Sequence, residues 1–367
     1  MVDTHVDTTQ RLVFESFDLG ARHADGSVDI PRLRHGGLGA VFFAVWMPGT
    51  VTGLAAVQCG REQIQAIRQQ IASHGEDLML ACSTKEIHEA RQAGRIAVLI
   101  GIEGGHLINN DLDVLRMYYD LGARYMTLTH SLNVDWADAS TDVPAHNGLT
   151  AFGAQVIREM NRLGMMVDVS HVSDKTFYDV LETSQAPVIA THSCCRALCD
   201  SARNMSDDMI RALAARGGVI QINFHTGFLS QGFRTVWKAN PSLELEIDAR
   251  IKERCGENQA WQLREGSTLI REMVTRGKLP RVEWAEILEH IGHVTDLVGA
   301  EHVGLGSDFD GANMPYGMED ASCFPKITEG MLSESYPDSD IQKILGGNAL
   351  RLMQDVEAIA HKMEEEK

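Results

Sequence analysis

Continuous apolar runs recur along the chain, and stretches with helical periodicity separate most of them. Runs that are apolar throughout, rather than at every second position, are typical of parallel strands buried on both faces. Strands that alternate with helices form right-handed βαβ units, and eight such strands close most naturally into a (β/α)8 TIM barrel. The predicted strands cover residues 4–7, 36–46, 95–103, 124–130, 165–171, 187–192, 218–225 and 302–308.

Between the predicted strands, helical periodicity covers residues 57–73, 112–121 and the C-terminal stretch 340–367, and Ser83 to Glu86 resembles a helix capping box. We therefore expect a single barrel domain over residues 1–367. The barrel rhythm is interrupted only at residues 231–280, where charged and amide side chains surround two helical patterns, 243–252 and 263–274. This insertion follows the seventh predicted strand, so it should emerge on the active-site face as a lid or an oligomer contact. A solvated insertion without a function is the alternative.

Composition restricts the class of partner. The 367 residues include 33 Lys and Arg against 51 Asp and Glu, a formal charge of −18 that repels nucleic acid and anionic membranes. No apolar run in the sequence is long enough for a membrane span, and the sequence does not open with the basic and then apolar segments of a secretory signal. We therefore expect a cytoplasmic protein, and the negative charge favours a small-molecule partner.

The seven cysteines lack the repeated C-x-x-C spacing of a structural zinc site. We interpret them as reduced thiols. Cys194, Cys195 and Cys199 crowd one segment and are expected to be packing groups near a functional loop. A ligand role for Cys194 or Cys195 is the less favoured alternative.

Metal-competent side chains occur at the ends of six of the predicted strands. A lone histidine at a strand end is more often a hydrogen-bonding residue than a ligand. In a TIM barrel, however, the C-terminal strand ends converge on the active site, so a whole set of such residues indicates a metal centre. The set comprises His5, Asp7, Glu103, His130, His171, His192 and Asp308.

Alternation within an extended strand places His5 and Asp7 on one face, with Val6 on the other. Taken alone, this pair could also be a solvated turn near a frayed terminus. Together with the other strand ends, it could hold one divalent ion. His171 and His192 could hold a second, with Glu103 as a bridge.

Nitrogen and oxygen ligands favour zinc, with cobalt or manganese as substitutes. A water shared by two such ions becomes a hydroxide nucleophile, so hydrolysis of a carbonyl compound is the expected reaction. Asp308 could then accept a proton from this water and return it to the leaving amine, and His130 could donate to the developing oxyanion. Arg203 could clamp a substrate carboxylate, or it could form a surface ion pair.

Several stretches resemble the membrane (renal) dipeptidases and their bacterial relatives. They are Glu103 to His106 with Asp111-Leu112, residues 121–130, residues 168–171, residues 191–193 with Arg203-Asn204, and residues 304–311. The resemblance implies a binuclear zinc dipeptidase on a TIM barrel, with two Zn²⁺ per chain. It makes His5 and Asp7 ligands of one ion, His171 and His192 ligands of the other, and Glu103 the bridge. It also implies that His130 and Arg203 contact the substrate and that Asp308 handles the proton.

The chain departs from the family pattern in two places. Where the family usually has D-G-H-N-D, this chain has Val6 at the position of the Asn. Where the family usually has C-x-H-P-R-N, this chain has Ser201-Ala202 in place of the His-Pro pair. The second change lies next to Arg203 and bears on substrate preference. The signal peptide and lipid-anchor signal of mammalian members are not recognisable either, which favours a soluble, microbial-type protein.

The favoured function is hydrolysis of dipeptides of the L-Xaa-L-Xaa and L-Xaa-D-Xaa types. The alternative enzyme is a related amidohydrolase that acts on N-acyl amino acids, D-configured ones especially, or on β-lactam-like amides. A metal-dependent binding or regulatory protein is disfavoured because Asp308 and His130 are both present, and a structural metal site needs neither. We also expect a homodimer, since such barrels often pair.

Overall fold

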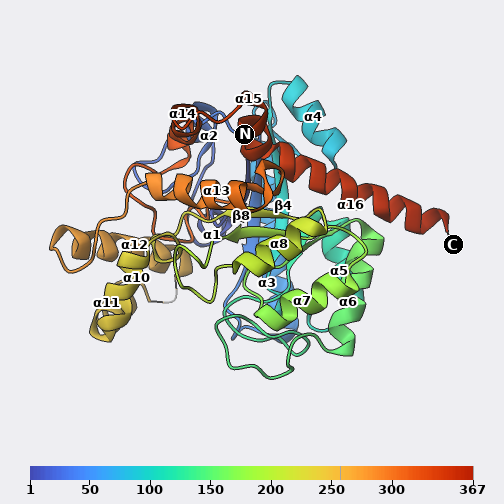
Figure 1. Ribbon diagram of the computed structural model, residues 1–367, viewed down its shortest axis with the longest axis horizontal. Coiled ribbons are helices and arrows are strands. Elements are labelled where there is room, and N and C mark those ends of the chain that lie inside the picture. Colours follow the sequence, from blue (N-terminus) through green and yellow to red (C-terminus); the bar gives the residue numbers. More distant parts are fainter. Residues whose placement is uncertain (257, 367) are drawn as a thin grey trace.

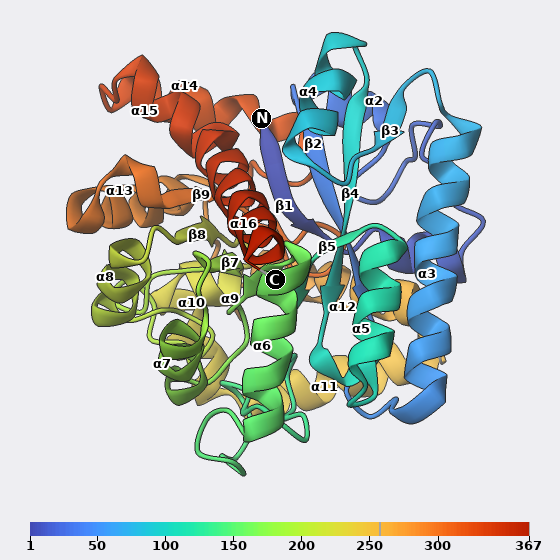
Figure 2. The same ribbon diagram turned by 90° about the vertical axis from the view of Figure 1, so that its right-hand side faces the viewer.

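The computed structural model of the protein describes residues 1–256 and 258–366. Parallel strands form a barrel with helices around it (Figures 1 and 2). Along the barrel the order is β1 (Val2–Val6), β2 (Ala40–Trp46), β4 (Ile96–Glu103), β5 (Ala123–Thr127), β6 (Met166–Asp168), β7 (Ile189–Ser193), β8 (Val219–Ile222) and β9 (Val303–Leu305). A short strand that the sequence pattern did not predict, β3 (Leu78–Leu80), pairs with β4 outside this path.

The first and last strands join through the residues that follow them. The backbone N–H of Asp7 donates to the carbonyl of Phe309 at 2.8 Å, and that of Asp308 donates to the carbonyl of His5 at 3.0 Å. Val6 and Phe309 form an isolated parallel bridge. These contacts bring the two ends of the sheet together, so the predicted (β/α)8 barrel is confirmed.

The helices predicted at residues 57–73 and 112–121 are present with small differences in their bounds, and Ser83 caps the helix that begins at Thr84 by accepting from the N–H of Glu86. The C-terminal stretch predicted as one helix is interrupted at Gly346, whose φ of 145° is not helical. In the described residues, no helix is both long and apolar enough to cross a membrane. The helices around the barrel are α1 (Thr9–Phe14), α2 (Ile30–His35), α3 (Gly53–Ser73), α4 (Thr84–Gln92), α5 (Leu112–Asp120), α6 (Ala151–Leu163), α7 (Asp174–Thr183), α8 (Asp207–Ala215), α9 (Thr226–Leu229), α13 (Ala285–Val298), α14 (Pro325–Ser333), α15 (Asp338–Gln342) and α16 (Asn348–Glu365).

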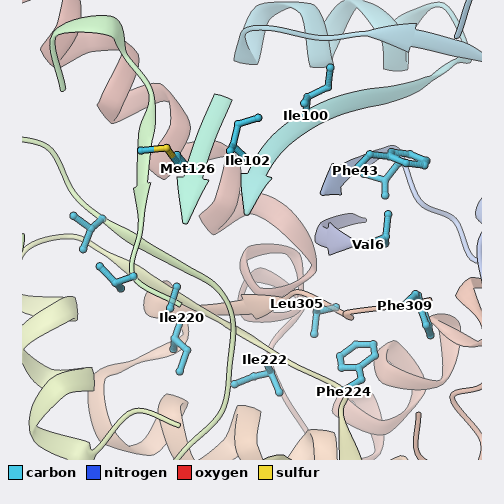
Figure 3. Close-up of a cluster of buried hydrophobic side chains, with 14 of the residues drawn as sticks. Val6, Phe43, Ile100, Ile102, Met126, Ile220, Ile222, Phe224, Leu305 and Phe309 are labelled. Atoms are coloured by element: carbon cyan, nitrogen blue, oxygen red, sulfur yellow. The ribbon is translucent and has the colours of Figure 1, made fainter. Parts of the chain in front are cut away.

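Alternating strand residues separate two apolar layers. Val6, Phe43 and Ile102 belong to the layer in which the strands meet the surrounding helices (Figure 3). Phe42 and Leu99, an odd number of positions from Phe43 and Ile102 along the same strands, belong to a second cluster that also contains residues of α16. Because Val6 lies in the first layer, its neighbours His5 and Asp7 point to the opposite face of β1.

The insertion consists of α10 (Gln231–Ala239), α11 (Pro241–Cys255) and α12 (Gln259–Thr275), which lie to one side of the barrel in Figure 1. The two predicted helical patterns fall within α11 and α12, and these helices pack on a small apolar core of their own. The role of the insertion as a lid or an oligomer contact remains a prediction.

Several predicted strands are too long. β5 ends at Thr127, β6 at Asp168, β8 at Ile222 and β9 at Leu305. The residues beyond these ends turn away from the ladder, and His171 and Asp308 have left-handed backbone angles, with φ of 70° and 63°. A non-glycine residue in this region is strained, and such residues concentrate at functional sites.

Candidate metal and substrate site

Glu103, the last residue of β4, is the centre of the predicted cluster. Its Oε2 lies 3.4 Å from His5 Nε2. Its Oε1 lies 3.1 Å from His171 Nε2 and 3.4 Å from His192 Nε2. One oxygen of the carboxylate therefore faces one imidazole and the other oxygen faces two, which allows Glu103 to bridge two cations. The ring centres of His5 and His192 lie 3.8 Å apart, and these two residues also form one candidate metal group with Glu103.

The remaining predicted ligand, Asp7, is on the His5 side of Glu103. Its Oδ2 lies 3.7 Å from His5 Nε2, and Asp308 joins the same two residues in a group whose potential ligand atoms lie within 4.8 Å of one another. The barrel thus brings together all five predicted ligands at its C-terminal end, from strands far apart in the sequence.

The chemistry of this cluster fits a cation. Buried His5 Nε2 and Asp7 Oδ1 have no hydrogen-bond partner among the described residues. Burial raises the pKa of Asp7 well above its usual value, and the neighbouring carboxylate of Glu103 acts in the same direction. Buried charges of this kind are normally paired or coordinate a metal. The donors are imidazole nitrogens and carboxylate oxygens, which suit zinc.

Two hydroxyl groups hold the histidine rings from behind. Tyr125 Oη lies 2.9 Å from His5 Nδ1, and Thr191 Oγ1 lies 2.8 Å from His192 Nδ1. Tyr125 can occupy this position because Gly101 faces it: a Cβ on Gly101 would lie 1.9 Å from the Tyr125 ring. Neither contact was predicted, although an inward-facing Tyr beside a Gly on the next strand is a weak signal for such packing.

His130 lies at the edge of the cluster. Its Nε2 is 3.8 Å from Glu103 Oε1, and its ring packs against those of Trp46 and His171. Burial lowers the pKa of His130 to about 4, so the ring is neutral near pH 7. His130 also forms a candidate metal group with Glu103 and His171, so it is close enough to be a ligand as well as a donor.

Asp308 follows β9 and is held by Asn223, whose side-chain amide donates to Oδ2 at 2.8 Å. The turn after it approaches the cluster closely, because a Cβ on Gly311 would lie 1.8 Å from Asp7 Oδ2. Asn223 was within a predicted strand, but nothing in its sequence context indicated this contact.

Arg203 is buried, so the alternative of a surface ion pair is wrong. Its Nη2 donates to the carbonyl of His192 at 3.0 Å, its guanidinium lies 5.2 Å from the centre of the Phe228 ring, and its Nε has no partner in the described residues. The guanidinium therefore sits beside the metal cluster with hydrogen-bonding capacity unused.

A cavity of about 330 Å³ joins these groups. The predicted residues that line it are Asp7, Glu103, His130, His171, Arg203 and Asp308, and residues not predicted include Trp46, His225, Phe228, Arg234 and Leu263. Arg234 and Leu263 come from the insertion. Cys194, Cys195 and Cys199 are buried free thiols outside the candidate metal groups, each donating to a backbone carbonyl.

The model of the membrane dipeptidase family (peptidase family M19) matches residues 1–367. The chain belongs to this family. Dipeptidase 3 of Macaca fascicularis is 34% identical over 98% of the chain, which spans 65% of the length of that protein. The fungal dipeptidase aclJ of Aspergillus oryzae is 33% identical over 92% of the chain, which spans 72% of that protein's length.

Solved structures share the fold of this family member. The probable dipeptidase PvdM of Pseudomonas aeruginosa superposes with a TM-score of 0.82 at 24% identity, covering 98% of this chain and 95% of that chain. A metallopeptidase of Rhodobacter sphaeroides, solved with a phosphinate mimic of L-Ala-D-Ala, gives a TM-score of 0.78 at 23% identity over 97% and 98% of the two chains. These likenesses support the barrel assignment independently.

Proposed function

We propose that this chain is a metal-dependent dipeptidase that hydrolyses the peptide bond of L-Xaa-L-Xaa and L-Xaa-D-Xaa dipeptides. One observation carries the proposal: the same cavity is lined by Glu103, whose carboxylate lies among histidines, and by the buried Arg203. The first part fits metal-assisted hydrolysis, and the second fits a substrate that ends in a carboxylate. Family membership supports the same reaction.

Two Zn²⁺ ions are the proposed cofactors. His5 and Asp7 would hold one ion, His171 and His192 the other, and Glu103 both. When bound, the ions supply a water activated near neutral pH and polarise the substrate carbonyl.

The chain's own groups then have separate tasks. Asp308 accepts the proton of the attacking water and returns it to the leaving amine, while Asn223 fixes the carboxylate by its bond to Oδ2. Neutral His130 carries an N–H that can donate to the carbonyl oxygen as negative charge develops there. Arg203 binds the substrate carboxylate through the donors that the fold leaves free.

The size of the cavity supports a small substrate. Its volume of about 330 Å³ is at the lower end of the range of roughly 300–1,000 Å³ typical of small-molecule sites. Trp46 and Ser131 lie on its wall together with the reactive groups.

The test is a panel of L-Xaa-L-Xaa and L-Xaa-D-Xaa dipeptides and their N-acetylated counterparts, assayed with zinc supplied. A dipeptidase should cleave the free dipeptides and discriminate strongly against the acetylated ones. Equal turnover of both would favour the N-acyl amino acid amidohydrolase instead. Metal-loaded protein that cleaves nothing in the panel would point to a binding protein. The cytoplasmic location and the homodimer remain predictions.

A further inference from the structure

Arg234 places a second guanidinium on the wall of the cavity that contains Arg203. It comes from α10, the first helix of the insertion, and is half-buried. Its Nε donates to the carbonyl of Asp200 at 2.6 Å, which leaves both terminal nitrogens without a partner in the described part of the chain. The carbonyl of Asp200 thus orients the Arg234 guanidinium, and the N–H groups of its two terminal nitrogens remain able to donate to a ligand.

The two arginines are held by one pair of connected loops. Asp200, whose carbonyl fixes Arg234, is only three residues before Arg203, and its own N–H donates to Gln231 at 2.7 Å. Asn204 ties the same loop to the carbonyl of Phe228 at 2.8 Å. Both guanidiniums are also near His225, whose pKa is lowered by burial and further by these two positive charges. They therefore belong to the same end of the cavity.

The two guanidiniums have few direct partners in the described residues. Burial lowers the pKa of Arg203, and the nearby carboxylates of Asp308 and Glu103 oppose this shift without bonding to the guanidinium. Arg203 bonds to a carbonyl and a hydroxyl, and Arg234 to a carbonyl; neither forms an ion pair within residues 1–256 and 258–366. Ser201 and Ala202, which lie on the wall beside them, are small and uncharged. A buried or half-buried charge without a partner is costly, which favours a ligand that brings the missing negative charges.

We propose that Arg203 and Arg234 together select dipeptides whose C-terminal residue has an acidic side chain, Arg203 binding the α-carboxylate and Arg234 the side-chain carboxylate. The inference rests on the proposed dipeptidase activity and adds to it a class of substrate. A planar guanidinium can form two parallel bonds to a carboxylate, and such bonds are about twice as strong as neutral ones. Replacing the substrate's side-chain carboxylate by an amide removes the charge at almost constant shape.

The test compares kcat/KM for L-Ala-L-Asp with L-Ala-L-Asn, and for L-Ala-D-Asp with L-Ala-D-Asn, with zinc supplied. The acid should be preferred by about 10–100-fold in at least one of the two pairs, because a hydrogen bond between charged groups is commonly worth that much. Arg234→Gln should bring the acid-to-amide ratio close to one. Arg234→Glu should invert it and favour a C-terminal Lys over Asp.

The ratio within one variant is unaffected by a general loss of activity, so partial misfolding cannot imitate the result. Arg276→Gln, which removes an exposed arginine from the end of α12, is the matched control and should keep the wild-type ratio. An acid-to-amide ratio of one in the wild type, together with good turnover of both, would overturn the inference and leave the dipeptidase intact. An equal loss for acid and amide in Arg234→Gln would also overturn it, because Arg234 would then share the α-carboxylate with Arg203. Failure to cleave any dipeptide would overturn the proposed function and this inference with it.

Discussion

Asp168 and Glu103 are both buried carboxylates at the ends of barrel strands, but their surroundings differ. Asp168 Oδ1 accepts from the backbone N–H groups of Ser170 and Thr191, each at 2.9 Å. Its Oδ2 accepts from the hydroxyl groups of Thr127 and Thr191. Glu103 instead faces the imidazoles of three histidines, in a cluster where Asp7 Oδ1 has no partner in the described residues.

The difference separates a structural carboxylate from a candidate ligand. Asp168 has its hydrogen-bonding capacity filled by the fold, so it joins β5, β6 and β7 and needs no further partner. Asp7 Oδ1 is left without a hydrogen-bond partner in the described residues, and Glu103 faces imidazoles that can themselves bind a cation. The following predictions test this contrast, beginning with the largest expected effect.

Glu103→Gln should abolish turnover. The amide cannot bridge two cations as a carboxylate does, so both ions should be lost while the fold remains. We expect metal analysis after dialysis to find little zinc, and the unfolding temperature to stop rising when zinc is added. Asp168→Asn is the carboxylate-to-amide comparison. Asp168 reaches the cluster indirectly, through the Thr191 hydroxyl group beside His192, so this variant should keep most of its metal. Full zinc content in Glu103→Gln would contradict the bridging role.

Asp308→Asn should retain about two metal ions per chain and lose most of its turnover. Proton transfer by a positioned carboxylate is commonly worth about 10²–10⁴-fold in rate. Metal analysis and kcat on a dipeptide substrate, made on the same preparation, separate the two effects. If the metal content falls with the rate, Asp308 is a ligand, as its closeness to His5 and Asp7 also permits.

Asp168→Asn should lower the free energy of unfolding by about 2–4 kcal/mol, because an amide cannot accept from four donors and leaves buried groups unsatisfied. Denaturant unfolding of metal-free protein is the measurement, since it excludes any contribution from the cations. If Asp168→Asn kept its stability but lost zinc, Asp168 would be part of the metal site rather than a structural carboxylate.

Tyr125→Phe should weaken zinc binding by about tenfold, since the hydroxyl group orients His5 from behind. Tyr118→Phe is the control: this hydroxyl group is equally buried, but it bonds to the carbonyls of Val57 and Leu107. Zinc titration should distinguish the two variants, while both lose a similar, small amount of stability. Equal zinc affinity in both variants would show that the His5 contact is dispensable.

The barrel and the set of candidate ligands could be predicted from local patterns. Most strands lie in largely apolar runs, and Glu103 and His192 stand at the ends of two of them. The strand of His5 is mostly polar, and it was predicted from the placement of His5 and Asp7 on one face. The sequence therefore determined which side chains would gather at one end, because parallel strands of a barrel all end on the same side. The short strand β3 was not recognised, since three residues are too few to show a period.

What the side chains do once gathered was decided by the tertiary structure. Asp168 and Glu103 look alike in the sequence, and only the folded barrel gives one a full set of donors and the other a set of imidazoles. Nothing in the sequence of the polar insertion singles out Arg234. In the fold, its bond to the carbonyl of Asp200 places it on the wall of the cavity that contains Arg203. The physical reason is that strand periodicity is set by neighbouring residues, whereas the satisfaction of a buried charge depends on groups far away in the sequence that meet only when the barrel closes.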